Sequence, residues 1–229
     1  ENLFNNIRRI VYLIETNIDK DMNIVEIVRS IFPAKTKDFV TAVDEHSIIL
    51  VKELREKETM DEIEKIAKMI SDTLSTELNV KVYISIGTVV SDLKDVSRSY
   101  KEAKMALEVG KIFENDKYIV NYEKLGIGRL IYQLPLSLCK MFIKEVLHGL
   151  TMDDFDDETL ATVNKFFENN LNVSETSRQL YIHRNTLVYR LDKLQKMTGL
   201  DLRNFDDAII FKITLMVSKY MMYMDKMVY

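Results

Sequence analysis

The chain has 229 residues, 47% of them hydrophobic and 30% charged, and its formal net charge is −4. This length accommodates two domains of roughly 100 residues each, with enough apolar content for a core in both. The negative net charge excludes a uniformly basic nucleic-acid coat. A nucleic-acid surface would therefore have to be a local positive patch, whose field reaches about 8 Å at physiological salt.

The single cysteine, Cys139, excludes an internal disulfide and is typical of a protein from a reducing cytoplasm. We interpret it as a small buried apolar residue, because no histidine is placed to activate its thiol.

Hydrophobic periodicity predicts alternating strands and helices in the N-terminal half. An apolar run predicts a buried strand over 9–16, and helical spacing predicts a helix over 22–32 that ends before Pro33. Strands over 37–43 and 48–54 enclose Asp44-Glu45-His46-Ser47, which is typical of a hairpin turn.

The same half continues with a second set of elements. We expect a helix over 60–78, a half-buried strand over 80–86, a helix over 92–113 and a short strand over 118–122. The order β-α-β-β-α-β-α-β predicts an α+β domain whose helices pack on a mostly antiparallel sheet.

Residues 125–150 are expected to connect the domains. Gly126 and Gly128 interrupt the pattern, and helical spacing then resumes from Leu130 to Val146. A helix over 157–169 would support the elements that follow. The apolar run over 208–224 is interrupted by charges and falls short of the ~20 apolar residues that span a bilayer, so it predicts a closing helix. The expected domains are 1–124 and 151–229, joined by a helical connector over 125–150.

The stretch from residue 174 to 191 carries the strongest functional signal. Ser174 suits the N-cap of a short helix, because its hydroxyl can accept a bond from a first-turn amide. Tyr181, Ile182 and His183 have the length of the turn in a helix-turn-helix motif. His183 can cap a second helix that starts at Arg184.

The second helix is predicted to be amphipathic. Leu187, Leu191 and Leu194 recur at i, i+4 and i+7 and predict a buried stripe, and Gly199 predicts the helix end. The opposite face carries Asn185, Tyr189, Lys193 and Lys196. An ordinary helix pair with a solvated polar face is the alternative. The face is cationic and aromatic without mixed sign, which favours a DNA-reading helix.

Each side chain of this candidate interface has an expected role. Arg184, Asn185 and Thr186 should contact base edges in the major groove. Tyr189 and Lys193 should contact phosphates, His183 should cap the helix and touch a phosphate or base, and Ser174 and Arg178 should reach the DNA backbone from the first helix. Arg190 lies on the flank, where an internal ion pair with Glu175 is an equal alternative to a DNA contact.

Two sets of residues resemble a known family. The run Leu180-Tyr-Ile-His-Arg-Asn-Thr-Leu-Val-Tyr-Arg-Leu191, followed by Met197-Thr-Gly-Leu-Asp-Leu202, resembles the C-terminal helix-turn-helix of the PucR/CdaR family, bacterial regulators of purine and sugar-diacid catabolism. Ser177 stands where the family usually has alanine. Ser85-Ile86-Gly87 with the stretch 99–107 is similar to the degenerate GGDEF-like domain, of the ferredoxin or cyclase type, in the CdaR branch.

The resemblance covers nearly all of the chain and implies its function. It implies a cytoplasmic regulator that binds double-stranded DNA as a homodimer, with each subunit contacting one of two half-sites. It also implies that the regulator activates a catabolic operon in response to a small-molecule effector. The effector would bind a sensor domain that is absent from this chain. No cofactor, membrane partner or catalytic residue is expected.

An active diguanylate cyclase is the enzymatic alternative. Such an enzyme needs hairpin glycines for close approach of the nucleotide and carboxylates for Mg²⁺. The hairpin here lacks glycine, and the first strand ends Glu15-Thr16-Asn17 where the cyclase pattern has aspartate. We therefore expect no catalysis, while nucleotide or protein binding without turnover remains an alternative. His46, His148 and His183 lack the spacing of metal ligands.

Overall fold

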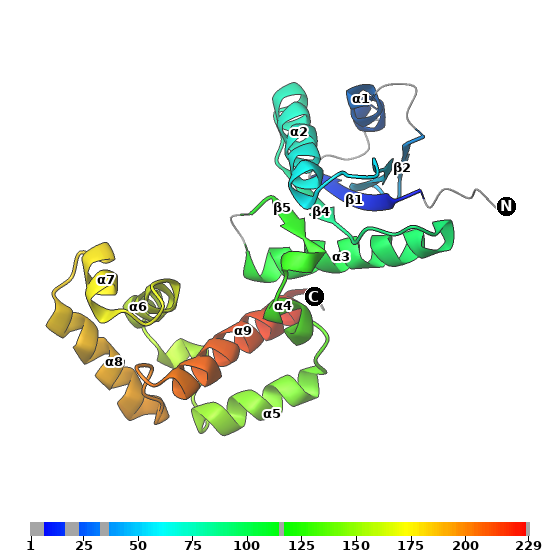
Figure 1. Cartoon of the computed structure of the whole chain (residues 1–229). Helices are drawn as coiled ribbons and strands as arrows, with labels where there is room; N and C mark the ends of the chain where they lie inside the picture. The colour runs from blue at the N-terminus through cyan, green and yellow to red at the C-terminus, as the bar shows by residue number, and fades with distance from the viewer. Residues whose placement is uncertain (1–6, 17–22, 33–36, 115–116, 228–229) are drawn as a thin grey trace. The chain divides into compact units, whose positions relative to one another are not determined.

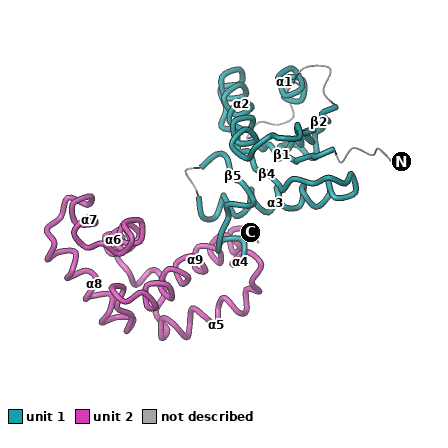
Figure 2. The backbone as a smooth tube through the Cα atoms, in the orientation of Figure 1, with its two compact units in different colours: residues 1–130 teal, residues 131–229 magenta. Residues whose placement is uncertain are grey.

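The structure is a computed structural model that describes residues 7–16, 23–32, 37–114 and 117–227 (Figure 1). The chain divides into two compact units, residues 1–130 and residues 131–229 (Figure 2). The described part of the first unit combines a sheet with helices, and that of the second is helical, which confirms the predicted α+β class followed by an all-α domain. The expected connector, 125–150, is divided between the two units.

The first unit is built on a five-stranded sheet in the order β2-β3-β1-β4-β5. All of its neighbouring strands pair antiparallel except β4 and β5, which are parallel, so the sheet is mostly antiparallel as predicted. The strands are β1 (Arg9–Thr16), β2 (Phe39–Ala42), β3 (Ser47–Glu53), β4 (Val82–Ile86) and β5 (Ile119–Asn121).

The central strand β1 is buried on both faces because its neighbours and two layers of helices cover it. Ile10, Tyr12 and Ile14 face the core shared with the first two helices, whereas Val11 and Leu13 pack toward the third. The Tyr12 hydroxyl donates to the Ile63 carbonyl oxygen at 3.0 Å, which ties the strand to the helix above it. Alternation along one strand thus builds both cores.

Three helices cover the sheet. α1 (Asn23–Ile31) and α2 (Met60–Leu78) lie on one face and α3 (Val96–Phe113) on the other (Figure 1). The predicted bounds of α2 match the structure, because Thr59 and Glu62 form a capping box at its start. The helix predicted from residue 92 begins instead as a 3₁₀ turn, η1 (Leu93–Asp95), which the Asp92 side chain caps.

The remaining short elements of this unit lead toward the second. They are η2 (Tyr122–Lys124) and α4 (Ile127–Ile131), whose last residue lies beyond the division between the units. Three residues of the predictions lie outside the described residues: Met22, the expected start of α1, Pro33, expected to follow its end, and Asn17.

The second unit contains α5 (Leu136–Leu147), η3 (Met152–Asp154), α6 (Asp157–Glu168), α7 (Val173–Gln179), α8 (Arg184–Thr198) and α9 (Phe205–Met227). Helix α5 packs along α9, and α6 packs against α7 and α8. Their shared core includes Phe155, Phe166, Leu191, Leu194 and Phe211. The closing helix predicted over 208–224 is confirmed as α9, and Cys139 is buried on α5 as expected.

The helical pattern predicted from Leu130 to Val146 is broken in the structure. α4 ends at Ile131 and α5 starts after Pro135, which caps it. Proline cannot donate a helical backbone bond, which explains the interruption. His148 ends α5 in the left-handed conformation, with φ of 52°, just before Gly149.

None of the helices in the described ranges is both long and apolar enough to cross a membrane.

Candidate nucleic-acid interface

The N-cap of α7, the first helix of the predicted pair, lies two residues earlier than the sequence suggested. The side chain of Asn172 accepts a bond from the Glu175 amide at 3.0 Å, so Asn172 is the N-cap. The assignment of Ser174 to this position was wrong, because Asn caps equally well and lies two residues earlier. Ser174 is instead exposed on the first turn, and its carbonyl oxygen accepts from the buried Ser177 hydroxyl at 2.9 Å.

The turn between α7 and α8 places Tyr181 in solvent. The side chain of Tyr181 is 95% exposed, and its backbone is left-handed with φ of 54°. A tyrosine rarely adopts this conformation, which favours glycine. The sequence assigned Tyr181 only to the turn, and the structure adds that its side chain is exposed two residues before the N-cap of α8.

His183 caps α8, as predicted. Its Nδ1 atom accepts from the Asn185 amide at 3.2 Å, so this nitrogen carries the lone pair and the proton of a neutral ring lies on Nε2. The cap fixes the first turn of α8, where Arg184, Asn185 and Thr186 are all exposed. The structure thus brings the three expected base-contacting side chains together at one helix end.

The two faces of α8 follow the predicted pattern. Leu187, Leu191 and Leu194 are at most 1% exposed, and Leu191 and Leu194 join the core of the unit. Tyr189 is 68% exposed, and Lys193 and Lys196 also lie in solvent. Gly199 ends the helix in the left-handed conformation with φ of 78°, as expected.

Several cations of this surface already have carboxylate partners. Arg178 binds Glu175 within α7, with Nε to Oε2 at 3.0 Å. Lys193 reaches across to α6 and binds Asp156, with Nζ to Oδ2 at 2.6 Å. Among the described residues, Arg184 and Lys196 make no ion pair.

Arg190 is held inside the unit, although its partner differs from the expected one. Its guanidinium pairs with Glu158 and donates from Nη1 to the hydroxyl of Thr162 at 2.9 Å, both on α6. The expected alternative partner Glu175 was wrong, because Arg178 and Gln179 occupy that carboxylate. The side chain of Arg190 is only 19% exposed, so the guanidinium braces α8 against α6.

The ion pairs keep the carboxylates charged. The ammonium of Lys193, followed by the bonds from Thr159, holds the pKa of Asp156 well below its usual range. The guanidinium of Arg178, followed by the Gln179 amide, lowers the pKa of Glu175 to about 2. The same pairings raise the pKa of Lys193 and of Arg178. At neutral pH every member of these pairs is therefore ionised.

The hairpin of the first unit shows a different chemistry. Asp44 and Glu45 are exposed on the turn, and Asp44 Oδ1 accepts from the His46 amide at 2.9 Å. A pocket of about 400 Å³ adjoins this turn and is lined by Glu26, Asp44 and Glu45, with Arg29 paired to Glu26 at 2.7 Å. Excess negative charge in the lining disfavours the phosphates of a nucleotide.

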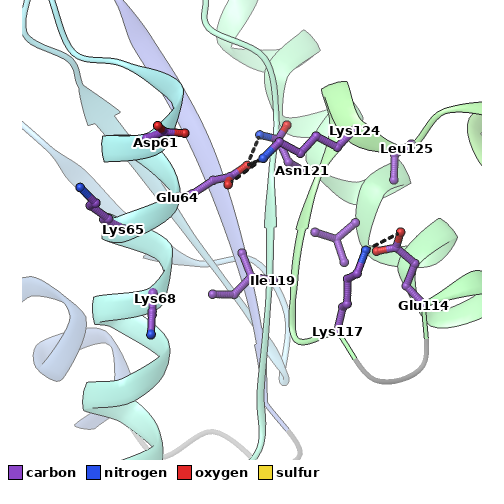
Figure 3. A pocket seen from close by; sticks show the side chains of 11 residues that line it. Asp61, Glu64, Lys65, Lys68, Glu114, Lys117, Ile119, Asn121, Lys124 and Leu125 are labelled. Atoms are coloured by element: carbon purple, nitrogen blue, oxygen red, sulfur yellow. Dashed lines mark hydrogen bonds and ion pairs between the residues drawn. The ribbon is translucent and has the colours of Figure 1, made fainter. Parts of the chain in front are cut away.

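A second pocket of the same unit, about 540 Å³ in volume, lies between α2 and β5 (Figure 3). Five of its polar groups bind one another, and Asp61, Lys65 and Lys68 also line it. Glu64 accepts from Lys124 and from the Asn121 amide, the latter at 3.1 Å, and Lys117 pairs with Glu114 at 3.1 Å. Within the described ranges, no group of His, Cys, Asp or Glu side chains is arranged to hold a metal ion.

The geometry therefore defines a protein with a GGDEF-like fold followed by a helix-turn-helix domain. Residues 5–109 match the GGDEF-like domain family, and residues 159–217 match the PucR C-terminal helix-turn-helix domain family. These two matches together span most of the chain, and they occur in the order expected from the sequence for the PucR/CdaR family. The chain belongs to the PucR/CdaR family of transcriptional regulators.

Named relatives support this assignment. The chain is 27% identical to the "Purine catabolism regulatory protein" of Bacillus subtilis (strain 168), over 64% of this chain and 28% of the relative. It is 31% identical to the "Carbohydrate diacid regulator" of Escherichia coli (strain K12), over 59% of this chain and 35% of the relative. It is 26% identical to the "Proline-responsive transcriptional activator PutR" of Bacillus subtilis (strain 168), over 85% of this chain and 49% of the relative. The aligned regions thus span between about a quarter and a half of these relatives.

Proposed function

We propose that the chain is the DNA-binding part of a cytoplasmic transcriptional regulator of a catabolic operon. The observation that carries this proposal is the capped start of α8, where Arg184, Asn185 and Thr186 are exposed together. These side chains can bond to base edges, and the N-terminal turn of a second helix is where such motifs read the major groove. The family membership supports the same conclusion.

The proposed contacts divide into two groups. Arg184, Asn185 and Thr186 read bases, and His183 orients them through its cap. The phosphates are bound by Tyr189, Lys193, Arg178 and Ser174, to which we add Tyr181, because its ring and hydroxyl project from the turn beside α8. Arg190 acts as a brace and contacts at most one phosphate, because its guanidinium is engaged by α6.

The regulator is proposed to bind as a homodimer, since helix-turn-helix proteins commonly read two half-sites about 34 Å apart. The names of the relatives suggest purine or sugar-diacid catabolism as the regulated process, with an effector-responsive activator as the mode. The proposed effector is a small molecule. The GGDEF-like unit is proposed to be non-catalytic, because its hairpin has no glycine and the adjoining pocket is acidic.

Selection of bound duplexes from a random library tests this function. The purified chain should enrich one sequence, and a mobility shift with the upstream region of its own operon should survive an excess of random duplex. Sedimentation at DNA-binding concentrations should give the mass of a dimer. Equal binding to selected and random duplexes would refute sequence-specific recognition.

A further inference from the structure

Two carboxylates at the start of α6 face cations of α8. Asp156 binds Lys193 with Oδ2 to Nζ at 2.6 Å, and Glu158 binds Arg190. These ion pairs lie within one compact unit and join residues more than thirty positions apart in the sequence. The sequence places an acidic block before the cationic helix-turn-helix motif, made of Asp153, Asp154, Asp156, Asp157 and Glu158. Two members of this block, Asp156 and Glu158, are thus folded onto that motif.

The Asp156 carboxylate is fixed at both oxygens. Oδ1 accepts from the Thr159 amide at 2.7 Å and caps α6, while Oδ2 accepts from the Lys193 ammonium. Helix N-terminal amides and lysine ammonium groups are two of the donor types that bind DNA phosphates. The carboxylate therefore occupies donors of the kind that a phosphate would use.

This arrangement sets up a competition for Lys193. A phosphate that approaches the ammonium meets the negative charge of Asp156, which cannot turn away without leaving the α6 amide unbonded. Glu158 is less constrained, since its side chain is 76% exposed and its partner Arg190 is also bonded to Thr162. The competition is therefore strongest at Asp156.

We propose that Asp156 is an intramolecular counter-ion that competes with DNA phosphate for Lys193 and so weakens binding to any duplex. The inference rests on the proposed function of DNA binding. Nonspecific binding depends almost entirely on phosphate contacts. Holding back one ammonium therefore removes a larger share of nonspecific affinity than of specific affinity, which disfavours the many competing sites of a genome.

The substitution Asp156→Asn isolates the ion pair. Asparagine caps helices about as well as aspartate, so α6 should keep its start while the charge is lost. Asp156→Ser, another capping residue without charge, provides a second variant. Asp157→Asn is the matched control, because Asp157 is the adjacent exposed residue of the acidic block and, among the described residues, makes no ion pair with α8.

Binding is measured by fluorescence anisotropy on a random-sequence duplex of about three helical turns, from about 50 to about 200 mM salt. Asp156→Asn and Asp156→Ser should bind roughly three- to fivefold more tightly than wild type, with a salt slope steeper by about one. Asp157→Asn should change affinity by less than about twofold. In a Lys193→Ala background, the gain from Asp156→Asn should disappear.

The outcomes separate this inference from the function on which it rests. If wild type binds duplex and Asp156→Asn and Asp157→Asn gain affinity equally, the change in net charge explains both gains. That result would overturn the counter-ion proposal but not the proposed function. A gain that persists without Lys193 would also overturn it. If neither wild type nor any variant binds selected or random duplex, the proposed function fails and the counter-ion fails with it.

Discussion

The polar turns of the two units differ in what their side chains do. In the hairpin of the GGDEF-like unit, Asp44 bonds to the His46 amide within the same turn. In the helix-turn-helix unit, His183 bonds to the helix it starts and leaves Tyr181 and Asn185 projecting into solvent. A turn whose polar groups bond locally supports the fold around it. A turn that directs them outward beside a capped helix is suited to recognise another molecule.

The largest expected effect is a loss of stability in the GGDEF-like unit, caused by a substitution that leaves the proposed base-contacting residues unchanged. A Cβ on Gly87 would lie 2.1 Å from the Ser99 carbonyl oxygen and 2.5 Å from its hydroxyl. Gly87→Ala should therefore lower the free energy of unfolding by roughly 3 kcal/mol, the upper end for overpacking. Urea denaturation followed by circular dichroism measures the change.

Gly126→Ala is the control for this effect. Gly126 has a positive φ of 54° but no atoms near its would-be Cβ, so only the backbone penalty of about 1 kcal/mol applies. Equal losses for the two variants would show that the close approach of Gly87 to Ser99 is unimportant for stability.

The next effect sharpens the recognition side of the comparison. Asn185→Ala should lower specific affinity by ~1–3 kcal/mol, because a bidentate base contact is lost, and should change affinity for random duplex little. Competition titrations on selected and random duplexes measure both. Losses of the same size on both duplexes would argue against a base-reading role for Asn185.

A smaller effect is expected at the turn itself. Tyr181→Gly should weaken duplex binding by about 1 kcal/mol through loss of the projecting ring and hydroxyl. Stability should stay within about 1 kcal/mol of wild type, because glycine removes the left-handed strain but adds freedom to the unfolded chain. Anisotropy and urea denaturation on the same sample give both quantities.

Tyr181→Phe is the companion variant. It separates a phosphate contact made by the hydroxyl from a packing contact made by the ring. A clear loss of stability in Tyr181→Gly, with duplex affinity unchanged, would mean that the tyrosine serves the fold and makes no DNA contact.

The smallest effect is expected from removing the ammonium group of Lys193, which is paired with Asp156. Lys193→Ala should weaken specific and random binding alike, by no more than about 1 kcal/mol, because an ammonium already paired at 2.6 Å gives up one partner to gain another. The salt slope should fall by well under one unit, because Asp156 already holds most of this ammonium back from phosphate. An unchanged slope would show that Lys193 does not contact a phosphate.

Local sequence signals predicted the elements that local chemistry determines. Helix α2 was predicted correctly because apolar residues recur along it at helical spacing, and α8 because a leucine stripe runs between the His183 cap and Gly199. The cluster of exposed side chains at the start of α8 followed from the same periodicity. Whether these side chains contact DNA stays a prediction.

Tertiary pairing was beyond the reach of such signals. The partner of Arg190 lies on another helix, at Glu158, and nothing in the spacing distinguishes it from Glu175 on the neighbouring helix. The N-cap of α7 was misplaced because Asn172 and Ser174 are both good capping residues. The left-handed backbone of Tyr181 could not be predicted, because neither Tyr181 nor the residue on either side of it is a glycine or an asparagine.

The brace formed by Arg190 restricts how α8 can adapt to its target. The Arg190 guanidinium binds both Glu158 and the buried hydroxyl of Thr162. Helices α6 and α8 should therefore move together as a single rigid body. Adjustment to grooves of different width would then fall to the rotamers at the tip of the reading helix. Such a protein should therefore bind a duplex of fixed curvature better than the same base sequence in a more strongly bent duplex.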